Sequence, residues 1–538
     1  MVNLRFLRSP WFLFMGALLL YAVLVLPAVG RQGISWDEQN DLWVAQSYLA
    51  APDGWLAGSE IDPSQTRLPM FTVALVYKLL GTSDLITARL VSCLVGGLTL
   101  LAVYFYCKLR FNLSTGILAC FLLATSPFYL SFARVAFTET DIYLACALTW
   151  LLVCVTRLQD RPTLGWAAGV GVVLGLALSA KFTALVVLPA VWYAVSQSKA
   201  TVPVKDLPQE KDSSVYFWNG WIIPLVWSVL HRSSTAPRMA LVSFITGLAL
   251  LTFLVVPPEH LTNPAILQSL LWRAENEMAF NPGFILEAAG LHIGSLIFKS
   301  GPLIGMGLLF GLLFTAFQWH GRPETRFPVL LTLFYFGGLI LLPLAQTFYI
   351  VPLLPILAVF AASQFHRLLA RRRAVAVGLA ALAVILWAVE MCLAYPDYNL
   401  NGYQWLGERV IAGRSSIGYR SIVQTPSDGV EQAVQWLNEH AQPGERVRSY
   451  LLEWHIVQAV APNPTYQIEN GFDAPSPEPD YVVVEINTQV RQSWWTDISR
   501  GDVFQPPYNP SWLEENYNKV FSVPRAFGIE MASVWKKK

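Results

Sequence analysis

Long apolar runs dominate this chain, and they restrict it to a protein that crosses a membrane several times. A run needs about 20 apolar residues to span a bilayer as a helix, and we expect about eleven such spans. Only 14% of the residues are charged, against about 25% in an average soluble protein. The expected spans lie near residues 11–30, 84–107, 113–130, 141–157, 163–180, 182–198, 237–257, 301–319, 327–343, 345–362 and 373–394.

The composition argues against a nucleic-acid partner and against a metal or disulfide role for the cysteines. The net charge is +1, whereas nucleic-acid-binding domains carry a basic patch, so we expect no nucleic-acid partner. The spacing of the cysteines is typical neither of a metal site nor of a set of disulfide bonds, and we interpret them as packing residues. All six lie inside apolar runs: Cys93, Cys107, Cys120, Cys146, Cys154 and Cys392.

The Lys and Arg residues of the loops predict the orientation. If the N-terminus is cytoplasmic, the inner loops hold about twice as many Lys and Arg residues as the outer segments. We therefore expect a multi-pass protein of the plasma (inner) membrane with a cytoplasmic N-terminus. The chain after residue 394 then lies outside the cytoplasm.

The chain divides into two expected domains. Residues 1–394 form a transmembrane domain with long outer loops at 31–83 and 258–300. Residues 395–538 are long enough for a small extracytoplasmic α/β domain. Within it, Gly429–His440 has an apolar face at helical spacing and Tyr481–Ile486 resembles a buried strand.

Two acidic clusters follow expected spans on the same outer side. The first is Asp37-Glu38, and the second contains Glu139 and Asp141. Carboxylates near a bilayer cost several kcal/mol unless they are solvated, paired or used in a function. The clusters could be solvated loop ends or charges at helix N-termini. Their common side indicates an active site.

The order of motifs resembles the GT-C superfamily of membrane glycosyltransferases, especially protein O-mannosyltransferase-like enzymes and lipid A aminoarabinose transferases. Each motif is weak by itself, and the shared order over residues 1–394 is more specific. The motifs are Trp36-Asp37-Glu38, Arg67-Leu68-Pro69, Ala88-Arg89-Leu90, Ala124-Thr125-Ser126-Pro127, Arg134 with Glu139 and Asp141, Lys181 after Ser179-Ala180, and Tyr349-x-x-Pro352-x-x-Pro355.

The resemblance implies an enzyme that moves a sugar from a polyprenyl-phosphate donor to a glycan, lipid or protein acceptor. Such a transfer requires a base that takes the acceptor's hydroxyl proton. The resemblance gives this role to Asp37, and Glu38 then orients Asp37 or contacts substrate. Glu139 and Asp141 orient the acceptor or hold a divalent cation such as Mg²⁺ or Mn²⁺. Thr66 stands where one branch has a metal-binding acid, so we favour a metal-free site.

The leaving phosphate needs cations, and the outer side offers several. Arginine binds phosphate oxygens in pairs, whereas lysine acts as a point charge. The same side chains could instead extend to lipid head groups. The candidate phosphate ligands are Arg67, Arg89, Arg134, Lys181 and Tyr349. His292, expected in the second long outer loop, is a candidate substrate or metal ligand or a packing residue.

Two other classes of protein remain open. A transporter would place ionisable groups near the middle of its spans and would show an inverted repeat. This chain shows no such repeat, and its expected spans are almost free of charge at their centres. A non-catalytic glycan-assembly protein would have no need of two acidic clusters on one side.

Overall fold

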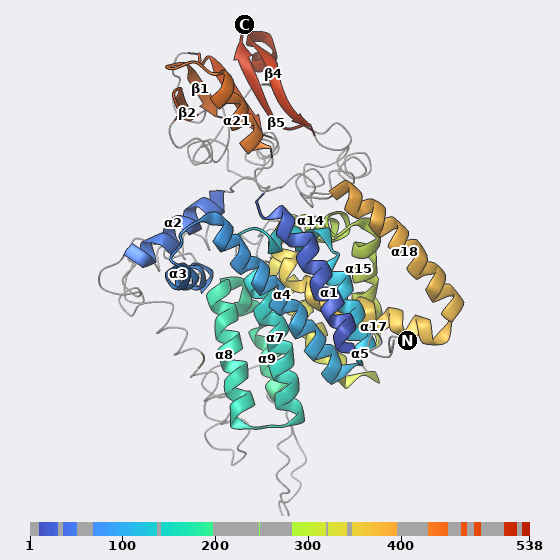
Figure 1. Ribbon diagram of the computed structural model, residues 1–538. Helices are drawn as coiled ribbons and strands as arrows, with labels where there is room; N and C mark the ends of the chain where they lie inside the picture. Colours follow the sequence, from blue (N-terminus) through green and yellow to red (C-terminus); the bar gives the residue numbers. More distant parts are fainter. Residues whose placement is uncertain are drawn as a thin grey trace, which may run out of the picture.

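The computed structural model describes residues 10–30, 36–50, 68–136, 141–196, 247, 282–318, 321–341, 347–394, 429–449, 464–470, 478–485, 510–524 and 530–538. These residues form a bundle of helices and, at one end of the bundle, a β-sheet with its own helices (Figure 1).

The first part of the bundle comes from residues 10–196. Its helices are α1 (Pro10–Val25), η2 (Leu26–Ala28), α2 (Trp36–Ala50), α3 (Leu68–Leu80), α4 (Leu85–Arg110), α5 (Leu113–Ala124), α6 (Pro127–Ala133), α7 (Asp141–Asp160), α8 (Leu164–Ala180), η4 (Phe182–Val187) and α9 (Leu188–Ser196). Several begin at a capping side chain of the type preferred at helix N-termini. Asp84, Asn112 and Thr163 each accept a hydrogen bond from the backbone N–H three residues later.

The second part of the bundle follows residue 281. Its helices are α14 (Pro282–Lys299), α15 (Pro302–Phe317), α16 (Pro323–Leu341), η6 (Thr347–Leu353), α17 (Leu354–Arg371) and α18 (Arg373–Ala394). Helices α15 and α17 approach closely, because a Cβ atom at Gly311 would lie 2.5 Å from the backbone nitrogen of Ala361. Small residues at such crossings are typical of helix packing within membranes.

Five helices of the described residues are long and apolar enough to span a membrane. They are Pro10–Ala28, Leu85–Arg110, Asp141–Asp160, Glu324–Leu341 and Tyr349–Arg371, and several shorter apolar helices accompany them. The predicted span at 237–257 lies almost entirely outside the described residues, so the total of about eleven spans stays a prediction.

The predicted single span at 113–130 is wrong in detail. The structure has two helices there, α5 and α6, bent by 69°. The bend follows from local chemistry, because Pro127 has no N–H group with which to continue α5. Ser126 instead caps the new helix by accepting a hydrogen bond from the Tyr129 N–H.

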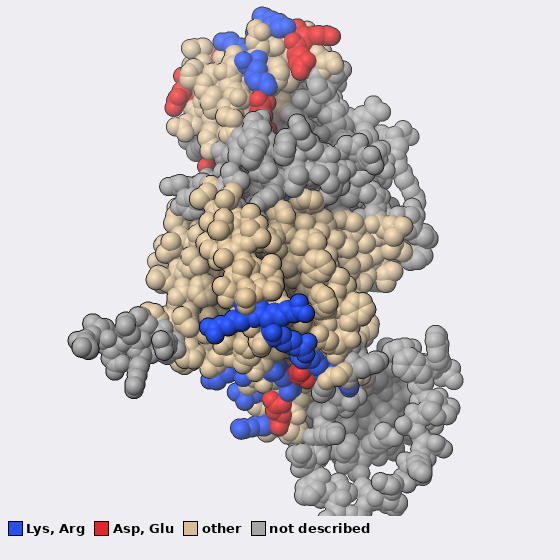
Figure 2. Space-filling model, turned by 90° about the vertical axis from the view of Figure 1, so that its right-hand side faces the viewer, with Lys and Arg blue, Asp and Glu red and all other residues tan. Residues whose placement is uncertain are grey.

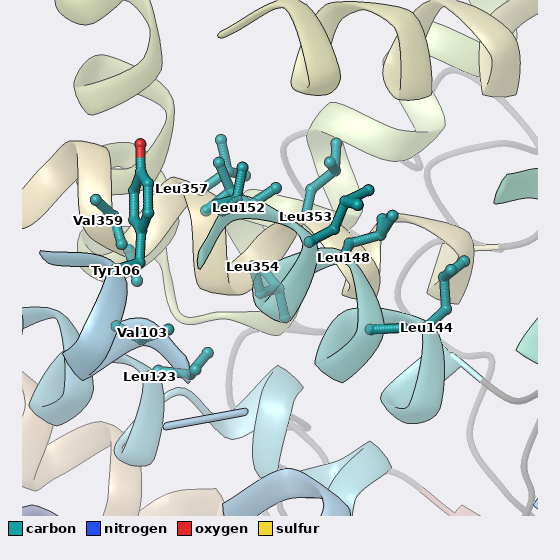
Figure 3. Packing of buried hydrophobic residues seen from close by; sticks show 14 of the residues in the cluster. Val103, Tyr106, Leu123, Leu144, Leu148, Leu152, Leu353, Leu354, Leu357 and Val359 are labelled. Carbon is teal, nitrogen blue, oxygen red and sulfur yellow. The ribbon is translucent and has the colours of Figure 1, made fainter. Parts of the chain in front are cut away.

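The core of the bundle is formed where α4, α5, α7 and α17 meet. Leu148 and Leu152 of α7 pack beside Leu354 and Leu357 of α17, and all four side chains are buried (Figure 3). Helices α4 and α7 run in the same direction, since Arg110 at the end of α4 binds Asp160 at the end of α7 at 3.0 Å. The beginnings of both helices therefore lie at the other end of the bundle.

Helix α3 packs against α2 rather than within the core. Figure 1 shows α3 end-on, whereas α7 and α8 run up the page, so α3 crosses the bundle direction. Val73 and Tyr77 of α3 join Val44 and Tyr48 of α2 in a small separate cluster of buried residues. This orientation is typical of an apolar helix that lies along a membrane surface.

The C-terminal residues contain a five-stranded sheet with the order β2-β1-β3-β5-β4. Strand β1 is parallel to β2 and β3, while β5 is antiparallel to β3 and β4. The elements are α21 (Val430–His440), β1 (Arg446–Ser449), β2 (Gln467–Asn470), β3 (Tyr481–Glu485), α24 (Pro510–Asn516), β4 (Tyr517–Pro524) and β5 (Glu530–Lys537). The helix expected at 429–440 and the strand expected at 481–486 are both present. The predicted domain boundary stays a prediction.

Charged side chains are distributed unevenly along the molecule. On the face shown in Figure 2, Lys and Arg side chains gather below a broad uncharged band. Helix α17 ends and α18 begins with four arginines, at positions 367, 371, 372 and 373. An uncharged band with basic residues at one edge is typical of a membrane-spanning protein.

Candidate active site

The first acidic cluster forms a buried ion pair. Glu38, in the first turn of α2, is fully buried, and Arg89, in the first turns of α4, is 2% exposed. The Arg89 Nε and Nη2 groups each donate to one Glu38 carboxylate oxygen at 2.8 Å. The Arg89 Nη1 group donates to the Val29 carbonyl at 2.7 Å. A paired contact of this kind fixes both the distance and the angle between α2 and α4.

This geometry changes the interpretation of both residues. Glu38 is not the solvated loop end that the sequence left open, because its carboxylate lies inside the protein. Arg89 does not extend to lipid head groups, because its guanidinium holds Glu38. The contacts favour a positioning role for Arg89, and its predicted contact with a phosphate stays a prediction.

The second acidic cluster contributes another buried pair. Asp141 is the first residue of α7 and is fully buried. The Lys181 Nζ group donates to the Asp141 Oδ2 atom at 2.9 Å. The backbone at Lys181 is extended, which separates α8 from η4 and forms the junction at which this side chain branches off.

Tyr349 completes this second cluster. The Lys181 Nζ atom lies 3.9 Å from the centre of the Tyr349 ring, which is a cation–π contact. Asp141, Lys181 and Tyr349 come from α7, the α8–η4 junction and η6. Three residues proposed separately from the sequence therefore lie together in the structure.

The two clusters are connected through the chain that precedes α7. The Ala136 N–H group donates to Glu38 Oε1 at 2.7 Å, five residues before Asp141. Arg134, two residues earlier, is fully buried. Both Arg134 and Arg89 interact electrostatically with Cys93 on α4, so both guanidinium groups approach the same part of that helix. Arg134 is thus inside the protein, in the same region of α4 as Arg89.

The structure places the other predicted site residues as follows. Asp37 belongs to the first turn of α2, immediately before Glu38, but its side chain is outside the described part of the structure. Arg67 and Glu139 are outside the described residues. His292 is in helix α14 rather than in the expected loop, and its buried ring lies 6.3 Å from the ring of Phe336. That position favours the packing interpretation of His292.

Sequence reasoning missed two carboxylates. Asp41 lies one turn after Glu38 on α2 and is only 5% exposed, a position that helical spacing from Asp37-Glu38 would have indicated. Glu431 lies in the first turn of α21, far away in sequence, yet it interacts electrostatically with Arg89 and Glu38. Burial raises the pKa of Glu431, Arg89 opposes that effect, and Glu38 adds to it. No sequence signal connects Glu431 to the first cluster.

The described residues do not gather three His, Cys, Asp or Glu side chains as metal ligands. Asp141 fits a cation only in part. Its Oδ1 atom is buried and has no hydrogen-bond partner among the described residues. Its Oδ2 atom, however, is bound to Lys181, whose positive charge opposes a metal ion at the same carboxylate.

Comparison with known proteins gives the fold a family context. Residues 64–207 match the family model described as dolichyl-phosphate-mannose-protein mannosyltransferase. That segment contains Arg67, Arg89, Arg134, Glu139, Asp141 and Lys181. No curated protein matches the chain in sequence.

Solved structures resemble the chain over nearly its whole length. ArnT from Cupriavidus metallidurans bound to undecaprenyl phosphate is 14% identical, with 97% of each chain covered and a TM-score of 0.52. The apo state of the same protein gives 14% identity, the same coverage and a TM-score of 0.51. The chain therefore shares the overall fold of ArnT. The resemblance inferred from the order of its motifs is confirmed.

Proposed function

We propose that this chain is a glycosyltransferase that moves a sugar from a polyprenyl-phosphate donor to a hydroxyl acceptor at the outer face of the plasma (inner) membrane. The observation that carries the proposal is the cluster of Asp141, Lys181 and Tyr349 beside the Glu38–Arg89 pair. These buried charges lie where α4 and α7 begin, at one end of a GT-C bundle. A transporter would instead concentrate them near the middle of its spans.

The donor class rests on two similar proteins. The family model that matches residues 64–207 is described by dolichyl-phosphate-mannose, and the similar ArnT structure is bound to undecaprenyl phosphate. Both molecules are long polyprenyl lipids that end in a phosphate. Lys181 is a suitable phosphate ligand, since a lysine supplies a point charge and Tyr349 already orients its ammonium group.

The reaction needs one proton transfer and one displacement. Asp37 takes the proton of the acceptor hydroxyl, whose oxygen forms a bond to the anomeric carbon of the donor sugar. The bond between that carbon and the phosphate oxygen breaks, and polyprenyl phosphate leaves with its charge held by Lys181, Arg134 and Arg67. Glu38, fixed by Arg89, orients the turn of α2 that carries Asp37.

A transfer assay tests this function. Membranes containing the chain are given radiolabelled polyprenyl-phosphate sugars, and label is followed into glycan, lipid and protein fractions. Membranes with the Asp141→Asn variant serve as the control. We expect transfer only with the unaltered chain. Movement of intact sugar-lipid between bilayer leaflets without any transfer would instead establish a transporter.

The orientation gives a separate prediction. With the N-terminus in the cytoplasm, a reporter enzyme that is active only in the cytoplasm should be silent when fused after Lys538. The same reporter fused after Arg373, at the start of α18, should be active. A strong signal from the fusion after Lys538 would place both acidic clusters on the cytoplasmic side and overturn the proposed function.

A further prediction concerns the metal. Because Lys181 already neutralises Asp141, we expect a chelator to leave transfer unchanged. The measurement is the initial rate of transfer in chelator, with and without added Mg²⁺ or Mn²⁺. Complete loss of transfer, with recovery on adding one of these ions, would contradict the metal-free interpretation. Glu139 and Asp141 would then be the leading ligands.

A further inference from the structure

A second group of buried polar side chains lies near the site and has no role in the mechanism above. Asp41 of α2, Ser92 of α4 and Tyr143 of α7 are each at least nine-tenths buried. The Tyr143 hydroxyl neighbours that of Ser92, and the Asp41 carboxylate interacts with Tyr143 electrostatically. The same three helices carry Glu38, Arg89 and Asp141.

Within the described part of the structure, the two hydroxyl groups of this cluster lie close to each other but have no well-formed hydrogen bond. Neither Ser92 Oγ nor Tyr143 Oη forms a hydrogen bond of good geometry with any described residue. A buried polar atom without a partner costs about 1–3 kcal/mol, and most buried polar side-chain atoms have one. Two such oxygens next to a buried carboxylate indicate a place prepared for a polar ligand.

We propose that Asp41, Ser92 and Tyr143 form a subsite for the ring hydroxyl groups of the donor sugar. This inference rests on the proposed function and names the part of the site that recognises the transferred group. Ser92 and Tyr143 each offer an O–H donor and lone pairs, and Asp41 accepts hydrogen bonds from sugar hydroxyls.

The polar groups of Asp41, Ser92 and Tyr143 fit a sugar better than they fit the other parts of the donor, the phosphate and the polyprenyl chain. A phosphate would be repelled by the Asp41 carboxylate, and a polyprenyl chain would leave all three polar groups unpaired. Neutral hydroxyl groups satisfy both the donors and the acceptor. The donor sugar is covalently attached to the phosphate that Lys181 is placed to hold. Tyr143 lies two residues after Asp141, the partner of Lys181, along α7.

The test compares lipids with and without a sugar. Binding to the purified full-length protein is measured for undecaprenyl phosphate alone and for undecaprenyl phosphate carrying mannose, glucose or 4-amino-4-deoxyarabinose. The variants are Tyr143→Phe and Ser92→Ala. Because the hydroxyls removed form no well-formed hydrogen bond with the described residues, thermal unfolding of the ligand-free variants should match that of the unaltered protein.

A matched control is available on α4. Tyr106 is also fully buried, and its hydroxyl has no hydrogen-bond partner among the described residues. It lies near the opposite end of α4, one turn before Arg110, away from the site. Tyr106→Phe makes the same chemical change as Tyr143→Phe and should not alter the binding of any of the four lipids.

We expect the unaltered protein to prefer at least one sugar-bearing lipid. Tyr143→Phe and Ser92→Ala should each weaken that binding by about three- to tenfold, the value of one hydrogen bond, without changing the binding of undecaprenyl phosphate. If both variants still preferred the sugar-bearing lipid to the same extent, the proposed subsite would be wrong, while the proposed donor would stand. Equal weakening for the sugarless lipid would also overturn the subsite. No preference in the unaltered protein would contradict the proposed donor itself.

Discussion

Asp37→Asn is expected to lower the turnover number by about 10²–10⁴-fold, because the substitution removes the base that takes the acceptor's proton. Asparagine has nearly the same size, and it is a good residue for a helix N-terminus, so α2 should still form. The measurement is the rate of label transfer at saturating donor, with the amount of folded protein determined by gel filtration in detergent.

Asp84→Asn is the matched control for this variant. Asp84 caps α4 through the Thr87 N–H, and asparagine caps equally well, so this change should not affect turnover. Near-normal transfer by Asp37→Asn together with complete loss in Asp141→Asn would assign the base to the second cluster. Loss of transfer in both variants agrees with the proposed mechanism, in which Asp141 positions Lys181 to hold the phosphate.

Arg89→Leu is expected to lower the free energy of unfolding by about 3–5 kcal/mol, because it leaves the Glu38 carboxylate buried without its cation. Glu38 has no exposed surface, and two of its hydrogen bonds come from Arg89. The measurement is denaturant-induced unfolding of the detergent-solubilised protein. Adding Glu38→Gln to the same chain should recover much of the loss, since it removes the charge and keeps an acceptor for Ala136.

Arg110→Leu serves as the comparison on the same helix. Arg110 binds Asp160 at 3.0 Å, but that pair is partly exposed, at 18% and 39% of the two side chains. Partly exposed pairs contribute about 0–1 kcal/mol, so the loss should be much smaller than for Arg89. Equal losses for the two variants would show that the Glu38–Arg89 pair is not buried as described.

Local patterns in the sequence were reliable where the physics is local. The apolar face of α21 contains Val430, Ala433, Val434 and Leu437, and these residues are the buried ones in that helix. Helical spacing alone predicts this face, because one side of a helix must be covered. The bend at Ser126-Pro127 has an equally local cause, and the capping chemistry of those two residues could have predicted it.

The roles of the charged residues depended on distant partners. The sequence placed Arg89 and Glu38 on one side of the membrane but could not pair them, since 51 positions separate them along the chain. Lys181 was expected to hold phosphate, yet its contacts with Asp141 and Tyr349 arise only where α7, η4 and η6 meet. Glu431 was missed for the same reason, whereas the local helical spacing from Asp37 and Glu38 would have indicated Asp41.

The sequence alone predicted a membrane protein that resembles the GT-C superfamily, because hydrophobic length and motif order are properties of the chain itself. The tertiary structure decided which charges are buried, which are paired and which hydroxyl groups lack a partner among the described residues. Burial and pairing depend on helices that are distant in sequence and adjacent in space, and the energy of a charge is set by those neighbours. The Glu38–Arg89 pair and the Asp41, Ser92 and Tyr143 cluster could therefore be recognised only after folding.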